Sequence, residues 1–194
     1  VVKMTGLRVT GGSANWPVIG GGISIVNADS VVLDRMEIYQ NNAEYGGGIN
    51  SGTVQYFKIT NSKIHSNSAQ YGGGIMFWED GEWGEIENTL IYDNEASSDG
   101  GGISTAIDRT ILNSSVIYRN KSGSGRYGPA IYIQKPNADT LLIMNSIVAE
   151  NLRGEEQDHQ IYRSGGQYRV YNSMIDWGWT NGTPYEYEGN IIYH

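Results

Sequence analysis

The chain has 194 residues, a formal net charge of −8 and a sequence pI near 4.8, and it contains no cysteine. This length suffices for one domain with a hydrophobic core, while the acidic balance argues against nucleic acid or an anionic membrane surface as a partner, since both reward clustered Lys and Arg. Without cysteine there are neither disulfides nor thiolate metal sites, and no apolar run approaches the roughly 18 residues of a membrane span.

A short glycine-rich motif recurs along the chain. Four copies read Gly-Gly-Gly-Ile, a degraded fifth reads Gly128-Pro129-Ala130-Ile131, and a sixth isoleucine follows His159-Gln160. The isoleucines stand at steps of 26, 26, 28, 28 and 30 residues; they are Ile23, Ile49, Ile75, Ile103, Ile131 and Ile161. A nearly fixed period in this range indicates stacked repeats, in which each repeat packs on its neighbours.

Each repeat is predicted to contain three short strands. The first directly follows the glycines, the second ends before an asparagine, and the third is the most regular, as in residues 61–67 and 88–94. No segment has the 3.6-residue period of a helix, so the strands are expected to wind as coils of a solenoid. Asparagine at equivalent corners can adopt a left-handed turn and bond to the next coil. Two such columns are predicted: residues 61, 88, 113, 145 and 172, and residues 41, 67, 94, 120 and 151.

These repeats resemble the right-handed parallel β-helix superfamily, the pectate-lyase-like proteins. The Gly-Gly-Gly-Ile pieces with Ile-x-x-Asn, as in 64–67 and 91–94, are also similar to repeats of bacterial β-helical surface proteins and adhesins. The resemblance implies an all-β, right-handed parallel β-helix of about six to seven coils with three short strands per coil. We expect residues 1–194 to form a single domain, excised from a larger multimodular protein. Function does not follow, because this scaffold carries lyases, hydrolases, adhesins and binding modules.

The side chains expected to point outward beside the isoleucine column lack catalytic groups. This outward column consists of Ser24, Asn50, Met76, Ser104, Tyr132 and Tyr162. In β-helix polysaccharide lyases and hydrolases, the catalytic acids, bases and calcium ligands commonly project from such a face. Proton abstraction beside a uronate needs a base and a cation, and glycoside hydrolysis needs two facing carboxylates. Neither arrangement is visible on adjacent coils, so no catalytic residue is predicted.

Aromatic side chains are the candidate ligand-binding residues. Tyr45, Tyr71 and Tyr127 each directly precede a glycine motif. The coil between those of Tyr71 and Tyr127 has Asp99 at the equivalent position. The glycines are explained by tight turns and close stacking, but they also leave a shallow trough beside these tyrosines. Flat aromatics bordered by hydroxyl and amide groups suit carbohydrate recognition. The predicted trough residues are Tyr45, Tyr71, Trp78, Tyr127, Tyr132 and Tyr162.

A second row of aromatics is predicted on the third strand. Tyr39, His65, Tyr92 and Tyr118 each follow an inward isoleucine and should face outward in a line. Their rings either stack on one another and stiffen the sheet, or contact a ligand. Tyr39, Tyr92 and Tyr118 are therefore the second candidate face.

The densest acidic segment is 79–85. Glu79, Asp80 and Glu82 are candidate calcium ligands, although neither the EF-hand spacing nor a calcium nonapeptide is present, and a solvated acidic turn is the simpler interpretation. No other cofactor is predicted.

The sequence therefore predicts a non-catalytic carbohydrate-binding module, similar to the β-helical modules that accompany xylanases of gut and rumen bacteria. The resemblance implies xylan or another hemicellulose as ligand, flanking modules of the same polypeptide as partners, and an extracellular or cell-surface location. A neutral polymer also suits a chain of charge −8 better than a polyuronate. Two alternatives stay open: a polysaccharide lyase or hydrolase of pectin or alginate type, and an adhesin or surface-protein stalk.

Overall fold

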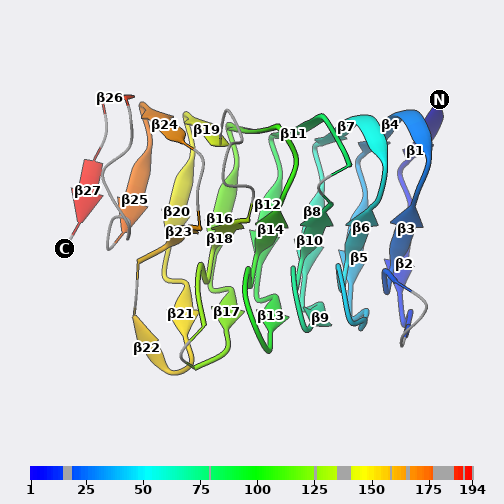
Figure 1. The fold of residues 1–194 in the computed structure, drawn as a ribbon, viewed down its shortest axis with the longest axis horizontal. Coiled ribbons are helices and arrows are strands. Elements are labelled where there is room, and N and C mark those ends of the chain that lie inside the picture. Colours follow the sequence, from blue (N-terminus) through cyan, green and yellow to red (C-terminus); the bar gives the residue numbers. More distant parts are fainter. Residues whose placement is uncertain are drawn as a thin grey trace.

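The protein is a solenoid of parallel β-strands, as seen in a computed structural model that describes residues 1–14, 19–78, 80–124, 126–134, 141–157, 159–164, 167–176, 186–189 and 191–193. Coils succeed one another along the long axis from the N-terminal to the C-terminal end (Figure 1). The described residues contain no helix. The predicted all-β parallel solenoid is confirmed.

Four sheets run along the solenoid, and the central coils pass through all four in the same order. Sheet 1 follows the glycines and consists of β3 (Ile23–Ile25), β6 (Ile49–Ser51), β10 (Ile75–Phe77), β14 (Ile103–Thr105), β18 (Ile131–Ile133) and β23 (Ile161–Arg163). Sheet 2 consists of β1 (Val2–Thr5), β4 (Ala28–Asp34), β7 (Val54–Thr60), β11 (Trp83–Glu87), β15 (Arg109–Asn113), β19 (Leu141–Met144), β24 (Tyr168–Tyr171) and β26 (Glu186–Glu188). Sheet 3 consists of β2 (Arg8–Thr10), β5 (Glu37–Tyr39), β8 (Lys63–His65), β12 (Leu90–Tyr92), β16 (Val116–Tyr118), β20 (Ile147–Ala149), β25 (Met174–Asp176) and β27 (Ile191–Tyr193).

Sheet 4 adds a strand to the three predicted for each coil. It consists of β9 (Ser68–Ala69), β13 (Glu95–Ala96), β17 (Lys121–Ser122), β21 (Leu152–Arg153) and β22 (Glu156–Gln157). These strands have two residues each, which is too short for a period-two pattern to be recognised in the sequence. β21 and β22 pair in an antiparallel hairpin, whereas the other pairings in this sheet are parallel.

The core is built from columns of apolar side chains, one from each coil. Strand register places the six motif isoleucines directly above one another, and all six are buried. A second column comes from sheet 3 and consists of Ile38, Ile64, Ile91, Ile117, Val148 and Ile175. Because each coil repeats the same alternation, a register slip would turn an entire apolar set to solvent.

A ladder of buried asparagines follows sheet 3 and confirms the coil-to-coil bonds predicted for one column, but the left-handed residue at this corner is the one before each asparagine, such as Ser66 or Asp93. Each amide nitrogen donates to the amide oxygen of the next coil, at 3.0 Å from Asn41 to Asn67 and 2.9 Å from Asn67 to Asn94. Asn94 to Asn120 and Asn120 to Asn151 continue it at 2.9 Å. The same oxygens accept backbone N–H groups, so each side chain satisfies polar groups that are out of reach of water.

The corner between sheets 2 and 3 carries the other column, with one correction. Asn61, Asn88, Asn145 and Asn172 have the predicted positive φ, but in the coil between Asn88 and Asn145 the left-handed residue is Ser114 and not Asn113. Strand register pairs Glu87 with Asn113, which puts Asn113 one residue before the corner. Both residues are polar and small, so the sequence pattern could not distinguish them.

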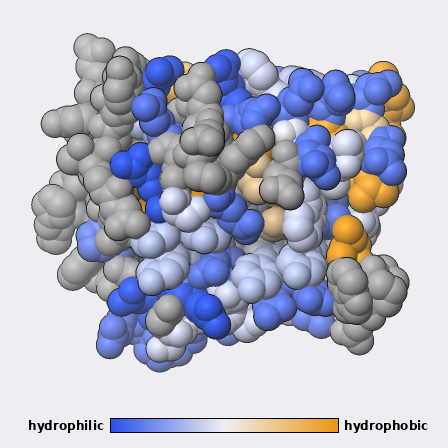
Figure 2. Space-filling view, in the orientation of Figure 1, coloured by the Kyte–Doolittle hydropathy of each residue, from blue (hydrophilic) through white to orange (hydrophobic). Residues whose placement is uncertain are grey.

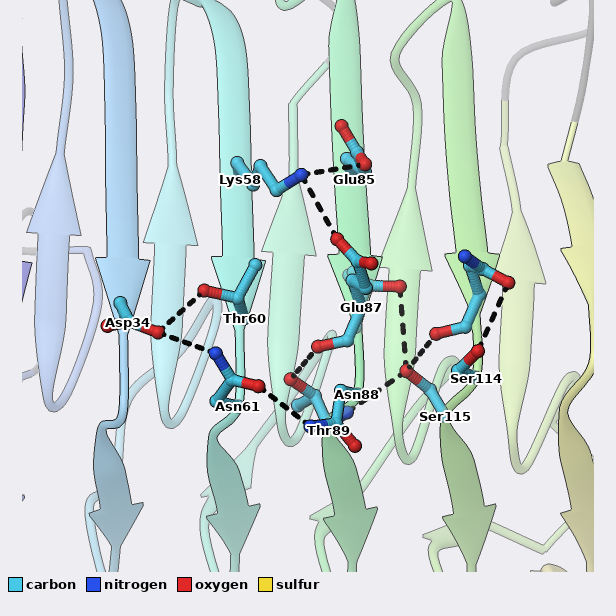
Figure 3. Close-up of polar contacts among 12 residues, drawn as sticks. Asp34, Lys58, Thr60, Asn61, Glu85, Glu87, Asn88, Thr89, Ser114 and Ser115 are labelled. Carbon is cyan, nitrogen blue, oxygen red and sulfur yellow. Dashed lines mark hydrogen bonds and ion pairs between the residues drawn. The ribbon is translucent and has the colours of Figure 1, made fainter.

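Beside this corner runs a second buried ladder, which was not predicted from the sequence. Hydroxyl groups accept the backbone N–H of the preceding coil, at 3.3 Å from Ser62 to Thr89. The next contact, from Thr89 to Ser115, is 3.1 Å long (Figure 3). Each hydroxyl also donates to the carbonyl two residues earlier in its own coil, as Thr89 does to Glu87 at 2.9 Å. The signal in the sequence is the Ser or Thr that directly follows the corner residue in every coil from Asn61 to Asn172.

The glycine motif has two separate structural functions. Its first residue has a positive φ, between +59° and +87° for Gly20, Gly46, Gly72, Gly100 and Gly128, a conformation that glycine adopts without strain. At Gly73, by contrast, an added Cβ would lie 2.6 Å from backbone atoms of Glu95 and Gly101 in the next coil. The degraded copy keeps the first glycine and replaces the other two, which agrees with this division.

Asp34, the last residue of β4 at the corner between sheets 2 and 3, should have an unusually acidic side chain. Hydrogen bonds from Asn61 (2.8 Å) and Thr60 (2.9 Å), with Arg35 alongside, lower the pKa of Asp34 to about 2. Because this pKa lies below the ordinary 3.8, the carboxylate contributes stability that is present above pH 3.8 and lost as the pH falls through about 2. A carboxyl-carbon NMR titration should give a value near 2 in the wild type.

The variant Asn61→Gly tests the cause. It preserves the positive φ of residue 61 while removing the strongest of these hydrogen bonds, so the pKa of Asp34 should rise toward 3.8. An unchanged pKa would show that Asn61 does not stabilise the carboxylate.

Candidate aromatic groove

A groove lies over the outer face of sheet 1. It has a volume of about 410 Å³ and is lined by Tyr45, Tyr71, Met76, Trp78, Asp99, Tyr132 and Gln134. Four of these residues were predicted to line the trough: Tyr45, Tyr71, Trp78 and Tyr132. In the space-filling view of Figure 2, a band of pale, weakly polar residues crosses several coils. We call this feature the aromatic groove.

The floor of the groove differs from the sequence expectation. Asn50, Met76 and Ser104 belong to the column predicted to point outward, yet all three are at most 1% exposed. They do lie on the face of sheet 1 opposite the isoleucine column, but larger side chains cover them. Trp78, for instance, donates from its indole Nε1 to Asn50 Oδ1 at 2.7 Å. Most of the surface offered to a ligand is therefore made by Tyr45, Tyr71 and Trp78, and the main contribution from this column is Tyr132.

One wall is formed by Tyr45, Tyr71 and Trp78. The rings of Tyr45 and Tyr71 stack with centroids 5.4 Å apart and planes within 10°, because the glycine motifs that follow them are in register. Trp78 packs at an angle of 51° against Tyr45, at 4.9 Å. These contacts hold the rings in place before any ligand arrives, which lowers the entropy cost of binding.

The other predicted aromatics gather at the C-terminal end of the groove. Tyr127 stacks on Tyr162 at 4.0 Å, and Tyr162 lies 5.9 Å from Tyr132, which itself lines the groove. All six predicted trough residues thus come together on one face, four lining the groove and two forming a stack beyond Tyr132. Whether this face binds a ligand stays a prediction.

Asp99 and Gln134 line the groove but were not predicted as site residues. Asp99 occupies the coil position at which neighbouring coils have a tyrosine, and Gln134 follows β18 as Trp78 follows β10. Gln134 donates from Nε2 to Ser104 Oγ at 2.6 Å. The sequence signal that could have identified Asp99 and Gln134 as groove residues is that they occupy the same repeat positions as Tyr71 and Trp78.

Burial favours the protonated phenol at two tyrosines of the groove, Tyr45 and Tyr132. Burial, followed by the nearby Glu44, raises the pKa of Tyr45 above its ordinary value of 10.0. Burial, followed by the charge of Asp99, likewise raises the pKa of Tyr132. Both hydroxyls are therefore neutral near neutral pH, and neither is activated as a base.

The second candidate face is a continuous stack of rings. Centroids are 5.2 Å apart from Tyr39 to His65, 4.6 Å from His65 to Tyr92, and 5.2 Å from Tyr92 to Tyr118, with planes within 18° throughout. Both flat faces of His65 and Tyr92 are thus covered by neighbours. A sugar ring that stacks on an aromatic needs an uncovered face, so this row fits the stiffening of sheet 3 better than ligand contact.

The calcium candidates do not assemble into a site in the part of the chain that is described. Glu79 lies outside the described residues. Asp80 and Glu82 do not belong to any group of three or more His, Cys, Asp or Glu close enough to hold a metal among the described residues.

The cluster of Lys58, Glu85 and Glu87 in Figure 3 is an ion-pair network rather than a catalytic pair of carboxylates. Lys58 reaches Glu85 at 3.0 Å and Glu87 at 3.1 Å on the outer face of sheet 2. Tyr56 also donates to Glu85 at 2.7 Å. Both carboxylates are engaged by a cation, which suits a structural function on neighbouring strands.

Comparison with known proteins defines the class of this fold. A family model described as a right-handed β-helix region matches residues 2–181, which is most of the chain. The chain therefore belongs to the right-handed β-helix family, in agreement with the stacked parallel coils. No curated protein and no solved structure matches it. Among the described residues there is also no helix with the length and hydropathy of a membrane span.

Proposed function

We propose that this protein is a non-catalytic carbohydrate-binding module that recognises a neutral plant cell-wall polysaccharide, xylan or a related hemicellulose, through the aromatic groove. The observation that carries the proposal is an open groove of about 410 Å³ lined by three tyrosines and a tryptophan, which suits the apolar faces of pyranose rings. Asp99 and Gln134 on the same lining offer hydrogen-bonding groups for sugar hydroxyls.

The ligand should be a chain rather than a single sugar. A second hollow of about 470 Å³ adjoins the groove, and Trp78 lines both. Its other lining residues are Ile19, Val26, Asn27, Gly52, Thr53 and Asp80. A polymer that crosses Trp78 would contact both hollows, so the affinity should increase with chain length.

A binding function is favoured over a lyase or hydrolase by the charges of the groove. Asp99 is the single carboxylate among its described lining residues, and none of them is a Lys or Arg. Glycoside hydrolysis usually requires two facing carboxylates, and uronate lyases require a base and a cation. The alternative of an adhesin stalk does not account for a groove of this size. The proposal includes an extracellular or cell-surface location and flanking modules on the same polypeptide.

Replacing Tyr71 by alanine should lower the affinity for xylohexaose about tenfold, because one uncovered ring face is removed from the groove. The matched control is Tyr118→Ala. Tyr118 ends a stack on sheet 3 much as Tyr71 ends a stack just before the glycine motif, and its removal should change the affinity less than twofold. Isothermal titration calorimetry measures both.

The reverse result, loss of affinity in Tyr118→Ala with none in Tyr71→Ala, would move the binding surface to sheet 3. No loss in either variant would contradict recognition through these aromatic rows.

A further inference from the structure

Asp99 interrupts a column of tyrosines. The column directly before the glycine motifs reads Tyr45, Tyr71, Asp99 and Tyr127 in successive coils. Tyr45 and Tyr71 stack on each other, and among the described residues Tyr71 has no ring on its opposite side. A tyrosine in place of Asp99 would continue the stack and cover that face, as happens throughout the row on sheet 3.

The interruption leaves room for one ring. The backbones of Tyr71 and Tyr127 belong to coils two steps apart, which is roughly 9.6 Å at about 4.8 Å for each step, and the ring of Tyr127 leaves this column to stack on Tyr162. A ring in contact with one surface on each side needs roughly 7 to 8 Å, at about 3.5 to 4.0 Å for each contact. Met76 lies at the base of this space and Tyr132 borders it, since both line the same groove.

The Asp99 carboxylate is fixed in position and still has acceptor capacity. Its Oδ1 accepts the Tyr127 backbone N–H at 2.8 Å, and its Oδ2 accepts the Ser98 hydroxyl at 3.2 Å. The residue is only 8% exposed, yet it lines the groove. Each carboxylate oxygen has a further lone pair, and an ionised carboxylate can only accept hydrogen bonds.

We propose that Asp99 determines the specificity of the aromatic groove: it leaves a slot for one pyranose ring on the open face of Tyr71, and its carboxylate accepts hydrogen bonds from that ring's hydroxyls. A ring with a carboxylate of its own is disfavoured in this slot, because two like charges would meet in a partly desolvated site. This inference rests on the proposed function and adds to it the chemistry of the selected sugar, a neutral ring that donates from its hydroxyls.

Two substitutions separate the shape of the slot from its charge. Asp99→Tyr fills the slot with the residue found at equivalent coil positions. Asp99→Asn keeps the shape and an oxygen for the Tyr127 N–H while removing the charge. Asp29→Asn, an exposed residue on β4 of sheet 2, makes the same charge change away from the groove. Near-ultraviolet circular dichroism and thermal unfolding report whether each variant is folded.

Calorimetry with xylohexaose and with hexagalacturonate, in chelator and at low salt, provides the test. We expect Asp99→Tyr to weaken xylohexaose binding at least tenfold. Asp99→Asn should weaken it severalfold and reduce the preference for xylohexaose over hexagalacturonate, whereas Asp29→Asn should bind like the wild type. If Asp99→Tyr does not fold, the isosteric Asp99→Asn decides the question alone through the change in preference.

Two failures are distinguishable. If the wild type binds xylohexaose and both Asp99 variants show its affinity and preference, Asp99 does not determine specificity, although the proposed function stands. If the wild type binds no neutral oligosaccharide or polysaccharide, the proposed function is wrong, and the assignment of Asp99 is wrong with it.

Discussion

Replacing Asn94 by alanine should lower the free energy of unfolding by about 3 to 5 kcal/mol, because several buried hydrogen bonds are lost together. Asn94 Oδ1 accepts the backbone N–H and the side-chain amide of Asn67, at 3.1 and 2.9 Å. Its Nδ2 donates to the Ile64 carbonyl at 3.0 Å and to Asn120 Oδ1 at 2.9 Å. Asn94 is 1% exposed, so water cannot readily replace these partners. Urea unfolding followed by circular dichroism measures the change.

The control for this prediction is Asn113→Ala. Asn113 also bonds to the next coil, accepting from Asn145 Nδ2 at 3.0 Å, but this contact is exposed to solvent. Its loss should cost less than about 1 kcal/mol. Equal losses in the two variants would show that the buried ladder contributes no more than the exposed corner does.

Replacing Gly73 by alanine should destabilise the protein by about 3 kcal/mol through direct overlap between coils. The added methyl group would lie 2.6 Å from the carbonyl oxygens of Glu95 and Gly101, which are backbone atoms and cannot rotate away. The coils would have to separate locally, which weakens the backbone hydrogen bonds from Gly73 to Gly100 (3.1 Å) and from Gly74 to Gly101 (3.2 Å).

Gly11→Ala separates this steric effect from backbone strain. Gly11 has a φ of +74°, yet nothing lies within 4 Å of a Cβ placed there. Its substitution should cost about 1 kcal/mol, from the left-handed conformation alone. Thermal or urea unfolding compares the two variants, and a greater loss in Gly11→Ala would contradict close coil packing as the reason for the central glycines.

The sequence was sufficient to predict the fold because each local pattern agrees with the same architecture. Isoleucines at steps of 26 to 30 residues define the coil, and Ile-x-x-Asn places the buried amides at one corner. Sheet 4 was missed because its two-residue strands have no alternation to detect. The left-handed corner residue predicted at Asn113 is in fact Ser114, one residue later, because these two adjacent polar side chains fit the pattern equally well.

The candidate site could be predicted less completely. Register alone brought the six aromatics to one face, because equivalent positions in successive coils lie side by side. How these aromatic side chains pack on one another depends on their rotamers, which the spacing of residues in the sequence does not predict. Trp78 folds over Asn50, and Tyr127 stacks on Tyr162 rather than along its own column. The burial of Ser104, to which Gln134 donates, likewise depends on a side-chain direction.

Binding of a neutral polysaccharide without its turnover is the central claim, and affinity electrophoresis tests it most directly. The wild-type protein is run through gels containing xylan, glucomannan, β-glucan, pectin or alginate, each with calcium and with chelator, and each polymer is assayed for new reducing ends and unsaturated products. We expect retardation by xylan or glucomannan in both conditions, with no product formed. Unsaturated product from pectin or alginate would instead make the protein a lyase, and no retardation by any polymer would favour a structural stalk.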